Sequence, residues 1–293
     1  MRRLAAEPGP TCPRSHASVA RLSTNAEPRS GAALSEAARA NIEAFLRRAP
    51  YLHDYELGDL DPREAAHTTW FAEDPVRAVA LLYHGLATPT LIALVAAGND
   101  ADRMRAMLAS VARTLPRRYI AHLSAGLIES LAPARAESLG QHWKMGLTAA
   151  ASPASTAAGE AIAHLTPGDA DAVVRFYAES YPDSYFEPVN LVRGPYLAIR
   201  DRHGIAAIAG VHAYSPATRV ASLGNIATRP DARGRGYARR VTAALCDRLR
   251  AEIDVIGLNV RADNAAAIAC YRAVGFERLG EYGEWRLTRD DDA

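Results

Sequence analysis

The loop 230–238, Pro-Asp-Ala-Arg-Gly-Arg-Gly-Tyr-Ala, constrains this chain most, because it joins a strand-like run (220–228) to a helical run (239–251). A helix start points unpaired backbone N–H groups and the positive end of the helix dipole outward, which favours an anion. Glycine lets a phosphate approach the backbone closely, and arginine adds bidentate cationic donors. The residues concerned are Arg233, Gly234, Arg235 and Gly236. The loop therefore predicts a phosphate-binding helix N-terminus, with a plain turn before a basic helix as the alternative.

The two common nucleotide-binding motifs do not fit this loop. A dinucleotide site needs a third glycine and an acidic residue about 20 residues further on. Here Arg239 follows the glycines, and the next strand-like run ends in Arg261. A P-loop needs Lys-Ser or Lys-Thr after its last glycine, and the loop has neither. The phosphate ligand therefore belongs to another class.

The spacing that fits is Arg/Gln-x-x-Gly-x-Gly/Ala, filled by Arg233, Gly236 and Ala238. It resembles the acyl-CoA pyrophosphate loop of the GNAT N-acetyltransferase superfamily. A second segment resembles that superfamily's Asn-x-x-Ala-x-x-x-Tyr-x-x-x-Gly-Phe signature and is typical of a capped helix that ends at a glycine. Its matching residues are Asn264, Ala267, Tyr271, Gly275 and Phe276. Together the two motifs extend the resemblance over residues 160–289.

The resemblance implies an α/β fold with a mixed sheet, in which one parallel strand pair splays apart to admit the pantetheine arm of the cofactor. We expect the C-terminal half to end in a hairpin over 276–287 that turns near 280–283. The N-terminal half repeats the order of a helix, a strand meander and then alternating helix and strand, with its last helix at 125–132. We therefore expect a degenerate copy of the same fold that lacks the phosphate loop. The whole chain resembles, loosely, the two-domain layout of glycine N-acyltransferase-like proteins.

Four segments are predicted along the chain. Residues 1–34 are rich in Arg, Ala, Ser and Pro and are expected to be a disordered extension, with a targeting segment as the alternative. Residues 35–147 are expected to form an N-terminal α/β domain, which the hypothesis above interprets as the degenerate copy. Residues 148–159 contain only Thr, Ala, Ser, Pro and Gly, a composition typical of a linker. Residues 160–293 form the catalytic domain.

The composition narrows the choice of partners and compartment. The chain has 293 residues and a formal net charge of +1, so no overall field favours nucleic acid or an anionic membrane. It has no apolar run of about 18 residues, which a membrane-spanning helix requires. Three cysteines form neither a metal pattern nor an even disulfide framework. We expect a cytoplasmic protein without a metal, a nucleic-acid partner or a membrane partner.

The resemblance implies how acetyl-CoA, or another acyl-CoA, is bound. Backbone N–H groups of the phosphate loop would hold the pyrophosphate. The preceding strand would offer its backbone to the pantetheine arm in the manner of an added strand, and the Ile226 amide would meet the acyl carbonyl oxygen. The loop residues are Arg233, Gly234, Arg235, Gly236, Tyr237 and Ala238, and the strand residues are Asn225, Ile226, Ala227 and Thr228.

Acyl transfer also needs proton donors and acceptors. Tyr271 is the candidate general acid for the departing thiolate, because a phenol stays protonated at neutral pH; a half-buried helix residue is the alternative. Asn264 would contact the pantetheine or the thiolate, or else only cap its helix. The general base stays open between His212, Glu187, Asp183 and a chain of waters. The acceptor pocket is predicted to include Tyr181, Tyr185 and Phe186.

The predicted function is N-acyltransferase activity, with direct attack by a primary amine on the thioester in a ternary complex. The acceptor is a small-molecule or peptide amine that the sequence does not name, and a homodimer is compatible with the resemblance. A non-catalytic acyl-CoA sensor or interaction module is the alternative. Nucleic-acid binding through the arginine cluster would need an extended basic stripe with interleaved aromatic residues, which the sequence lacks.

Overall fold

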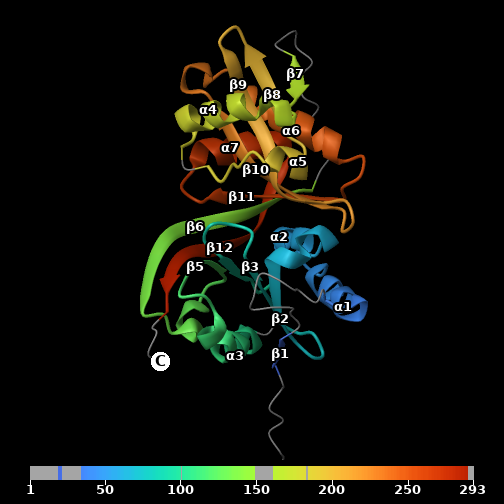
Figure 1. Ribbon diagram of the computed structural model, residues 1–293, viewed down its shortest axis with the longest axis vertical. Helices are drawn as coiled ribbons and strands as arrows, with labels where there is room; N and C mark the ends of the chain where they lie inside the picture. The colour runs from blue at the N-terminus through green and yellow to red at the C-terminus, as the bar shows by residue number, and fades with distance from the viewer. Residues whose placement is uncertain (1–18, 22–33, 100, 149–160, 183, 290–293) are drawn as a thin grey trace, which may run out of the picture.

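The computed structural model describes residues 19–21, 34–99, 101–148, 161–182 and 184–289. The N-terminal half contains β1 (Val19–Arg21), α1 (Glu36–Leu46), α2 (Asp54–Asp59), β2 (Thr68–Glu73), β3 (Val79–Tyr83), β4 (Thr90–Ala93), α3 (Ala101–Val111), β5 (Arg118–Leu123) and β6 (Arg135–Leu147). The C-terminal half contains β7 (Ile162–His164), α4 (Ala170–Ser180), α5 (Asn190–Arg193), β8 (Leu197–Asp201), β9 (Gly204–Ser215), β10 (Val220–Thr228), α6 (Tyr237–Leu249), β11 (Val255–Arg261), α7 (Ala265–Val274) and β12 (Phe276–Thr288). The two halves run through nearly the same order of elements (Figure 1).

Within the described residues, the strands form one 12-stranded sheet in the order β1-β2-β3-β4-β5-β12-β6-β11-β10-β9-β8-β7. The order is the same from either end when each strand is replaced by its counterpart in the other half. The counterparts are β1 and β7, β2 and β8, and so on to β6 and β12. Each half has one parallel pair, β4 with β5 and β10 with β11. The mixed α/β fold with an internal duplication, expected from the sequence, is therefore confirmed.

The two halves exchange their last strands. β6 lies between β11 and β12, and β12 lies between β5 and β6 (Figure 1). At the centre of the β6–β12 ladder His142 pairs with Tyr282. Each strand also has one unpaired residue beside this central part of the ladder, Leu139 in β6 and Leu279 in β12. Because each half completes its sheet with a strand of the other, neither half has a closed sheet of its own.

Helices cover both faces of the sheet at this junction. Lys144 of β6 contacts Asp54 of α2, whereas the neighbouring Trp143 lies under Arg272 of α7. Since successive side chains of a strand point to opposite faces, α2 and α7 lie on opposite faces of β6. The helix α2, although part of the N-terminal half, also packs on β9, β10 and β11.

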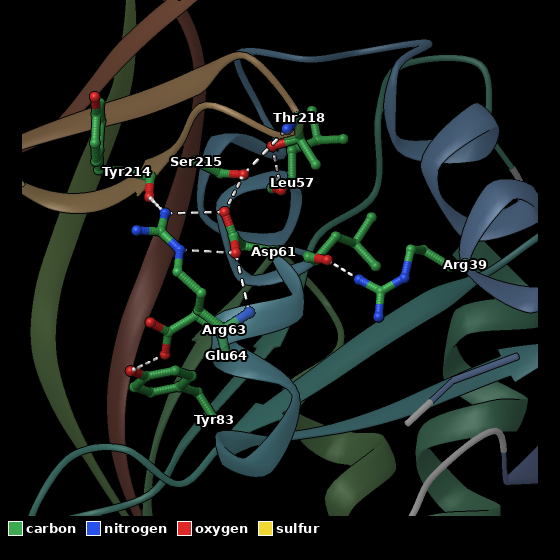
Figure 2. Close-up of polar contacts among 10 residues, drawn as sticks. Arg39, Leu57, Asp61, Arg63, Glu64, Tyr83, Tyr214, Ser215 and Thr218 are labelled. Atoms are coloured by element: carbon green, nitrogen blue, oxygen red, sulfur yellow. Dashed lines mark hydrogen bonds and ion pairs between the residues drawn. The ribbon is translucent and has the colours of Figure 1, made fainter. Parts of the chain in front are cut away.

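Polar contacts fix α2 and the turn after it to the β9–β10 hairpin. The Thr218 hydroxyl donates to the Leu57 carbonyl at 2.9 Å, and the Ser215 hydroxyl donates to Asp61 at 2.8 Å. Figure 2 shows that Arg63, ion-paired with the same Asp61, continues this network toward the hairpin. At the other end of α2, Lys144 Nζ lies 2.5 Å from Asp54 and both side chains are buried. One end of α2 is therefore bound to the C-terminal half, and the other end is bound to β6, the strand that the N-terminal half places beside β11.

The structure corrects several expectations from the sequence. The expected hairpin over 276–287 is one continuous strand, β12, which pairs with β5 and β6. The strand β6 was not expected, and it links the two predicted domains within one sheet. The helix expected over 125–132 is a short 3-10 turn, Ile128–Leu131. Within the expected disordered extension, Val19–Arg21 pair with β2.

The predicted linker 148–159, except residue 148, and the rest of the extension except residue 34 lie outside the described residues. Among the described residues, no helix combines the length and apolarity that a membrane crossing requires.

Candidate active site

The parallel strands β10 and β11 separate partway along their length. Their ladder ends where Leu223 lies opposite Leu258, although β10 continues to Thr228 and β11 to Arg261. On its other side β11 stays paired with β6 as far as Arg261. The backbone groups that lose their partners are therefore those on the edges of β10 and β11 that face each other. An unpaired strand edge can bind an extended ligand as an added strand. The splayed parallel pair that the resemblance implied is confirmed.

Two β-bulges lie where this opening begins. One register shift between β9 and β10 skips His212, and the next gives β10 one residue more than β9 across Asn225 and Ile226. Asn225 has a φ of 53°, in the left-handed region. A bulge bends its strand and re-aims the side chains around it. The bulges therefore explain how β10 turns away from β11.

Asn225 is buried and fixed at the second bulge. Its carbonyl oxygen accepts a hydrogen bond from the Tyr177 hydroxyl at 2.5 Å, and its Nδ2 donates to the Tyr196 hydroxyl at 2.9 Å. The Asn225 carbonyl, which the sequence assigned to the pantetheine arm, is thus already occupied. Of the expected pantetheine-binding residues, Ile226, Ala227 and Thr228 remain beyond the bulge on the diverging part of β10.

The phosphate loop has an open, left-handed backbone. Gly234 and Gly236 both have a φ of 76°, and a Cβ atom at either position would meet no atom within 4 Å. Gly236 is the N-cap of α6. Within the part of the chain that the structure describes, the backbone N–H groups of residues 234–236 make no hydrogen bond. Unpaired amides at an open helix N-terminus are the groups that bind a phosphate.

The arginines around this loop differ in availability. Arg229 is held by Asp201 and Asp231, at 2.7 and 2.6 Å, so its charge is already compensated. Arg233 and Arg235 are exposed, and within the described residues their guanidinium groups contact only backbone carbonyl oxygens, at 3.4 and 3.3 Å. The two arginines within the motif are therefore the ones that can turn toward a phosphorylated ligand.

Tyr271 lies on α7 and is 8% exposed, with its ring packed edge-on against Phe276. Burial raises the pKa of its hydroxyl above the usual value of 10, so the group keeps its proton at neutral pH. Among the described residues the hydroxyl has no hydrogen-bond partner. Its protonation state thus suits a proton donor, while its burial is also what a packing residue would show.

Asn264 is the N-cap of α7, and its Oδ1 accepts the Ala267 N–H at 3.1 Å. The capping interpretation therefore accounts for its oxygen. The glycine of the same motif also has its expected place: Gly275 has a φ of 115° and ends the helix.

The general-base candidates lie in different environments. His212 is exposed, its ring nitrogen Nδ1 lies 3.0 Å from the Tyr55 hydroxyl, and Tyr185 packs edge-on against its ring. Protein atoms crowd around the imidazole, and this desolvation lowers its pKa below the usual 6.5. Glu187 is exposed on the surface, and Asp183 lies outside the described residues.

The expected acceptor-pocket residues separate into two kinds. Phe186 stacks on Tyr177 and packs against Tyr196, so it belongs to the packing beneath the bulge. Tyr181 and Tyr185 are 41% and 58% exposed. Of the three residues, Tyr181 and Tyr185 are therefore the exposed ones, and Phe186 is half-buried.

Sequence reasoning missed two side chains beside the opening. Tyr55 comes from the N-terminal half, and no local pattern connects it to His212. Asn259 lies on β11 just past the end of the β10–β11 ladder, and both atoms of its buried amide lack a hydrogen-bond partner among the described residues. A polar residue within the apolar run 255–260 was the signal that could have revealed it.

Comparisons with known proteins agree with this geometry. The Acetyltransferase (GNAT) family matches residues 169–276. The N-alpha-acetyltransferase RimI of Mycobacterium tuberculosis is 47% identical over 55 residues, which are 19% of this chain and 34% of that protein. The chain thus spans about a third or less of the curated relatives it matches.

Two solved structures share the fold over most of the chain. A Drosophila protein superposes with a TM-score of 0.68 at 13% identity, over 92% of this chain and 99% of that one. A tandem GNAT protein from the clavulanic acid biosynthesis pathway has a TM-score of 0.51 at 15% identity, over 87% and 95%. The splayed strand pair and the phosphate loop thus lie within or beside the segment 169–276, which matches the Acetyltransferase (GNAT) family, and this segment is a domain of that family.

Proposed function

We propose that the C-terminal half transfers an acyl group, most simply acetyl, from coenzyme A to a primary amine. The observation that carries the proposal is the opening between β10 and β11 beside a helix whose N-terminus is open and glycine-lined. Members of the superfamily use an acyl-CoA as co-substrate, and this pair of features offers a backbone edge for pantetheine and amides for the pyrophosphate.

Each part of the cofactor has a candidate partner in this chain. The N–H groups of residues 234–238 bind the pyrophosphate, with Arg233 and Arg235 adding charge. The diverging part of β10 binds the pantetheine arm, and the Ile226 amide donates to the acyl carbonyl oxygen as that oxygen becomes negative. Asn264 retains only its Nδ2 for the cofactor, because its Oδ1 caps α7.

The reaction is a direct acyl transfer. The neutral amine attacks the thioester carbonyl carbon, a C–N bond forms, and the C–S bond breaks with its electron pair on sulfur. Tyr271 supplies the proton that converts the departing thiolate into a thiol. The amine loses a proton in the same reaction, so the products are an amide and free coenzyme A.

Calorimetry with acetyl-CoA combined with a thiol-release assay tests this proposal. The amine panel should include peptides with a free N-terminus, since the RimI protein is an N-alpha-acetyltransferase, together with polyamines, amino acids and aminoglycosides. Binding with amine-dependent release of coenzyme A is the expected result. Binding without turnover on any amine would favour the sensor alternative, and the absence of binding would contradict both.

A further inference from the structure

His212 stands out because it is itself the extra residue of a bulge. The β9 strand gains one residue at His212, directly beside the bulge of β10. Its ring lies against the backbone of Gly224, since a Cβ atom at that glycine would fall 2.3–2.4 Å from the ring atoms. Gly224 is followed by Asn225 and Ile226, the residues of the β10 bulge. The imidazole therefore lies next to the amide assigned to the acyl carbonyl.

Tyr55 holds this imidazole from the other half of the molecule. The Tyr55 hydroxyl lies 3.0 Å from Nδ1 of His212, and Lys144 Nζ lies 4.4 Å from the centre of the tyrosine ring. The same lysine pairs with the buried carboxylate of Asp54, the residue before Tyr55. At the opposite end of α2 the Leu57 carbonyl accepts a hydrogen bond from Thr218. The helix that carries Tyr55 is therefore held at both of its ends.

The groups around His212 leave one ring nitrogen available. The titratable or charged residues that face it are Tyr55 and Asp54 on α2 and Tyr185 after α4, with Lys144 behind Tyr55. The Asn225 side chain also lies close to the ring and raises its pKa, although its Oδ1 completes no hydrogen bond. Among the described residues no hydrogen bond to Nε2 is formed. Desolvation lowers the pKa of the imidazole, so the ring is neutral at pH 7 and carries one N–H and one lone pair.

We infer that His212 accepts the proton of the acceptor amine at Nε2, and that Tyr55 is the positioning residue that keeps the proton of the neutral ring on Nδ1. This inference rests on the proposed function and adds its general base. With Nδ1–H donating to the tyrosine oxygen, the Nε2 lone pair faces the acceptor. As the C–N bond forms, the amine proton moves to Nε2, and the imidazolium later returns it to solvent. The N-terminal half, which lacks the phosphate loop, thus completes the catalytic site of the C-terminal half.

Nitrogen NMR of the histidine rings tests the tautomer without any acceptor. In the full-length protein labelled with ¹⁵N-histidine, His212 should be the Nδ1–H tautomer at pH 7.5. Tyr55→Phe keeps the ring beneath Lys144 but removes the oxygen, so the tautomer should shift toward Nε2–H and the pKa should fall, because the imidazolium loses an acceptor. Tyr282→Phe, which alters another buried tyrosine near Lys144, should change neither. An Nε2–H tautomer in the unaltered protein would overturn the inference.

Kinetics provide the second test. His212→Gln should lower kcat/KM about 100-fold while the Kd of acetyl-CoA stays unchanged, and the acidic limb of its pH profile should disappear. Tyr55→Phe should lower kcat about tenfold and move that limb to lower pH. Full transfer by His212→Gln would overturn this inference alone. If the unaltered protein transferred acetyl to no amine, the proposed function would fail and this inference with it.

Discussion

The two halves of this chain share a topology but differ at one matched position. His122 of β5 pairs with Glu284, which lies two residues after Tyr282 of the central pair. Asn259 of β11 pairs with Lys144, which lies two residues after His142 of the same pair, so His122 and Asn259 occupy matching positions. His122 still pairs with Ile92 of the parallel neighbour, whereas Asn259 has no partner in β10. At this position the parallel pair is therefore still bonded in the N-terminal half and separated in the C-terminal half.

The cause of this difference lies in single inserted residues. The β3–β4 ladder runs without a register shift, and the Ser124 N–H bonds to the Ala93 carbonyl at 3.2 Å, which extends the β4–β5 contact. In the C-terminal half two bulges interrupt the equivalent ladder. The N-terminal half also has a 3-10 turn, Ile128–Leu131, where the other half has α7. One extra residue in a strand can thus separate a sheet with an open strand edge from one whose strands stay paired.

The largest expected effect comes from the glycine before each half's main helix. Gly98 and Gly236 have φ angles of 84° and 76°, and no atom of the described residues lies within 4 Å of the missing Cβ of either, so a side chain strains both alike. Gly236→Glu should abolish acetyl-CoA binding in calorimetry, more than about 100-fold, through charge repulsion and steric block. Gly98→Glu should leave the Kd unchanged. Equal losses in both variants would mean that backbone strain, not the phosphate site, is responsible.

The exchanged strands should make the two halves unfold together. Leu91 of β4 and Leu223 of β10 are buried in their respective cores. Either leucine changed to alanine should lower the free energy of unfolding by about 2–5 kcal/mol. Denaturation followed by fluorescence and by circular dichroism should show one shared transition in both variants. Two separated transitions would contradict the idea that β6 and β12 join the halves into one cooperative unit.

A buried tyrosine in each half offers the next comparison. Tyr271→Phe should lower turnover by about 10–100-fold with an unchanged Kd for acetyl-CoA, because the thiolate loses its proton donor. Tyr119 of β5 is also buried, and burial raises its pKa to about 12. Tyr119→Phe should leave turnover unchanged in the thiol-release assay. Normal turnover in Tyr271→Phe would show that this side chain only packs against Phe276.

The smallest effect concerns pH at the centre of the exchanged strands. Burial lowers the pKa of His142, so the unfolded chain binds more protons once the pH falls below about 6.5. Stability from this group is present above that pH and is lost as the pH falls toward the lower folded-state pKa. His142→Asn should flatten the slope of unfolding free energy between pH 7 and 5, measured by urea titration. His212 and His84 have lowered pKa values too, so part of the slope should remain.

His142→Asn has a control in its own cross-strand partner. Tyr282→Phe at the same central pair removes no group that titrates in this range and should keep the slope. A slope that His142→Asn leaves unchanged would contradict the assignment.

Local motifs predicted much of the C-terminal half from the sequence. The phosphate loop and the Asn264 to Phe276 signature depend on glycine conformation and helix caps, and the duplication followed from the order of elements. The exchange of β6 and β12 was not predicted, because strand neighbours depend on contacts between residues more than 100 apart in the chain. Gly280 and Gly283 suggested a turn, but β12 passes through both without one.

Large separation along the chain also explains why part of the candidate site was not predicted. Tyr55 and His212 lie 157 residues apart in sequence, and bulges such as that at Asn225 arise from pairing between strands. Candidate site residues that depend on a local backbone pattern were therefore predictable, whereas those brought together by the exchanged sheet were not.

The stoichiometry of coenzyme A binding tests the central claim most directly, because the claim is that only one of two duplicated halves has an open parallel pair. Calorimetric titration of the full-length protein with acetyl-CoA should give one bound ligand per chain. Two ligands per chain would mean that the closed pair of the N-terminal half also binds, and the absence of binding would mean that the opening between β10 and β11 is not a cofactor site.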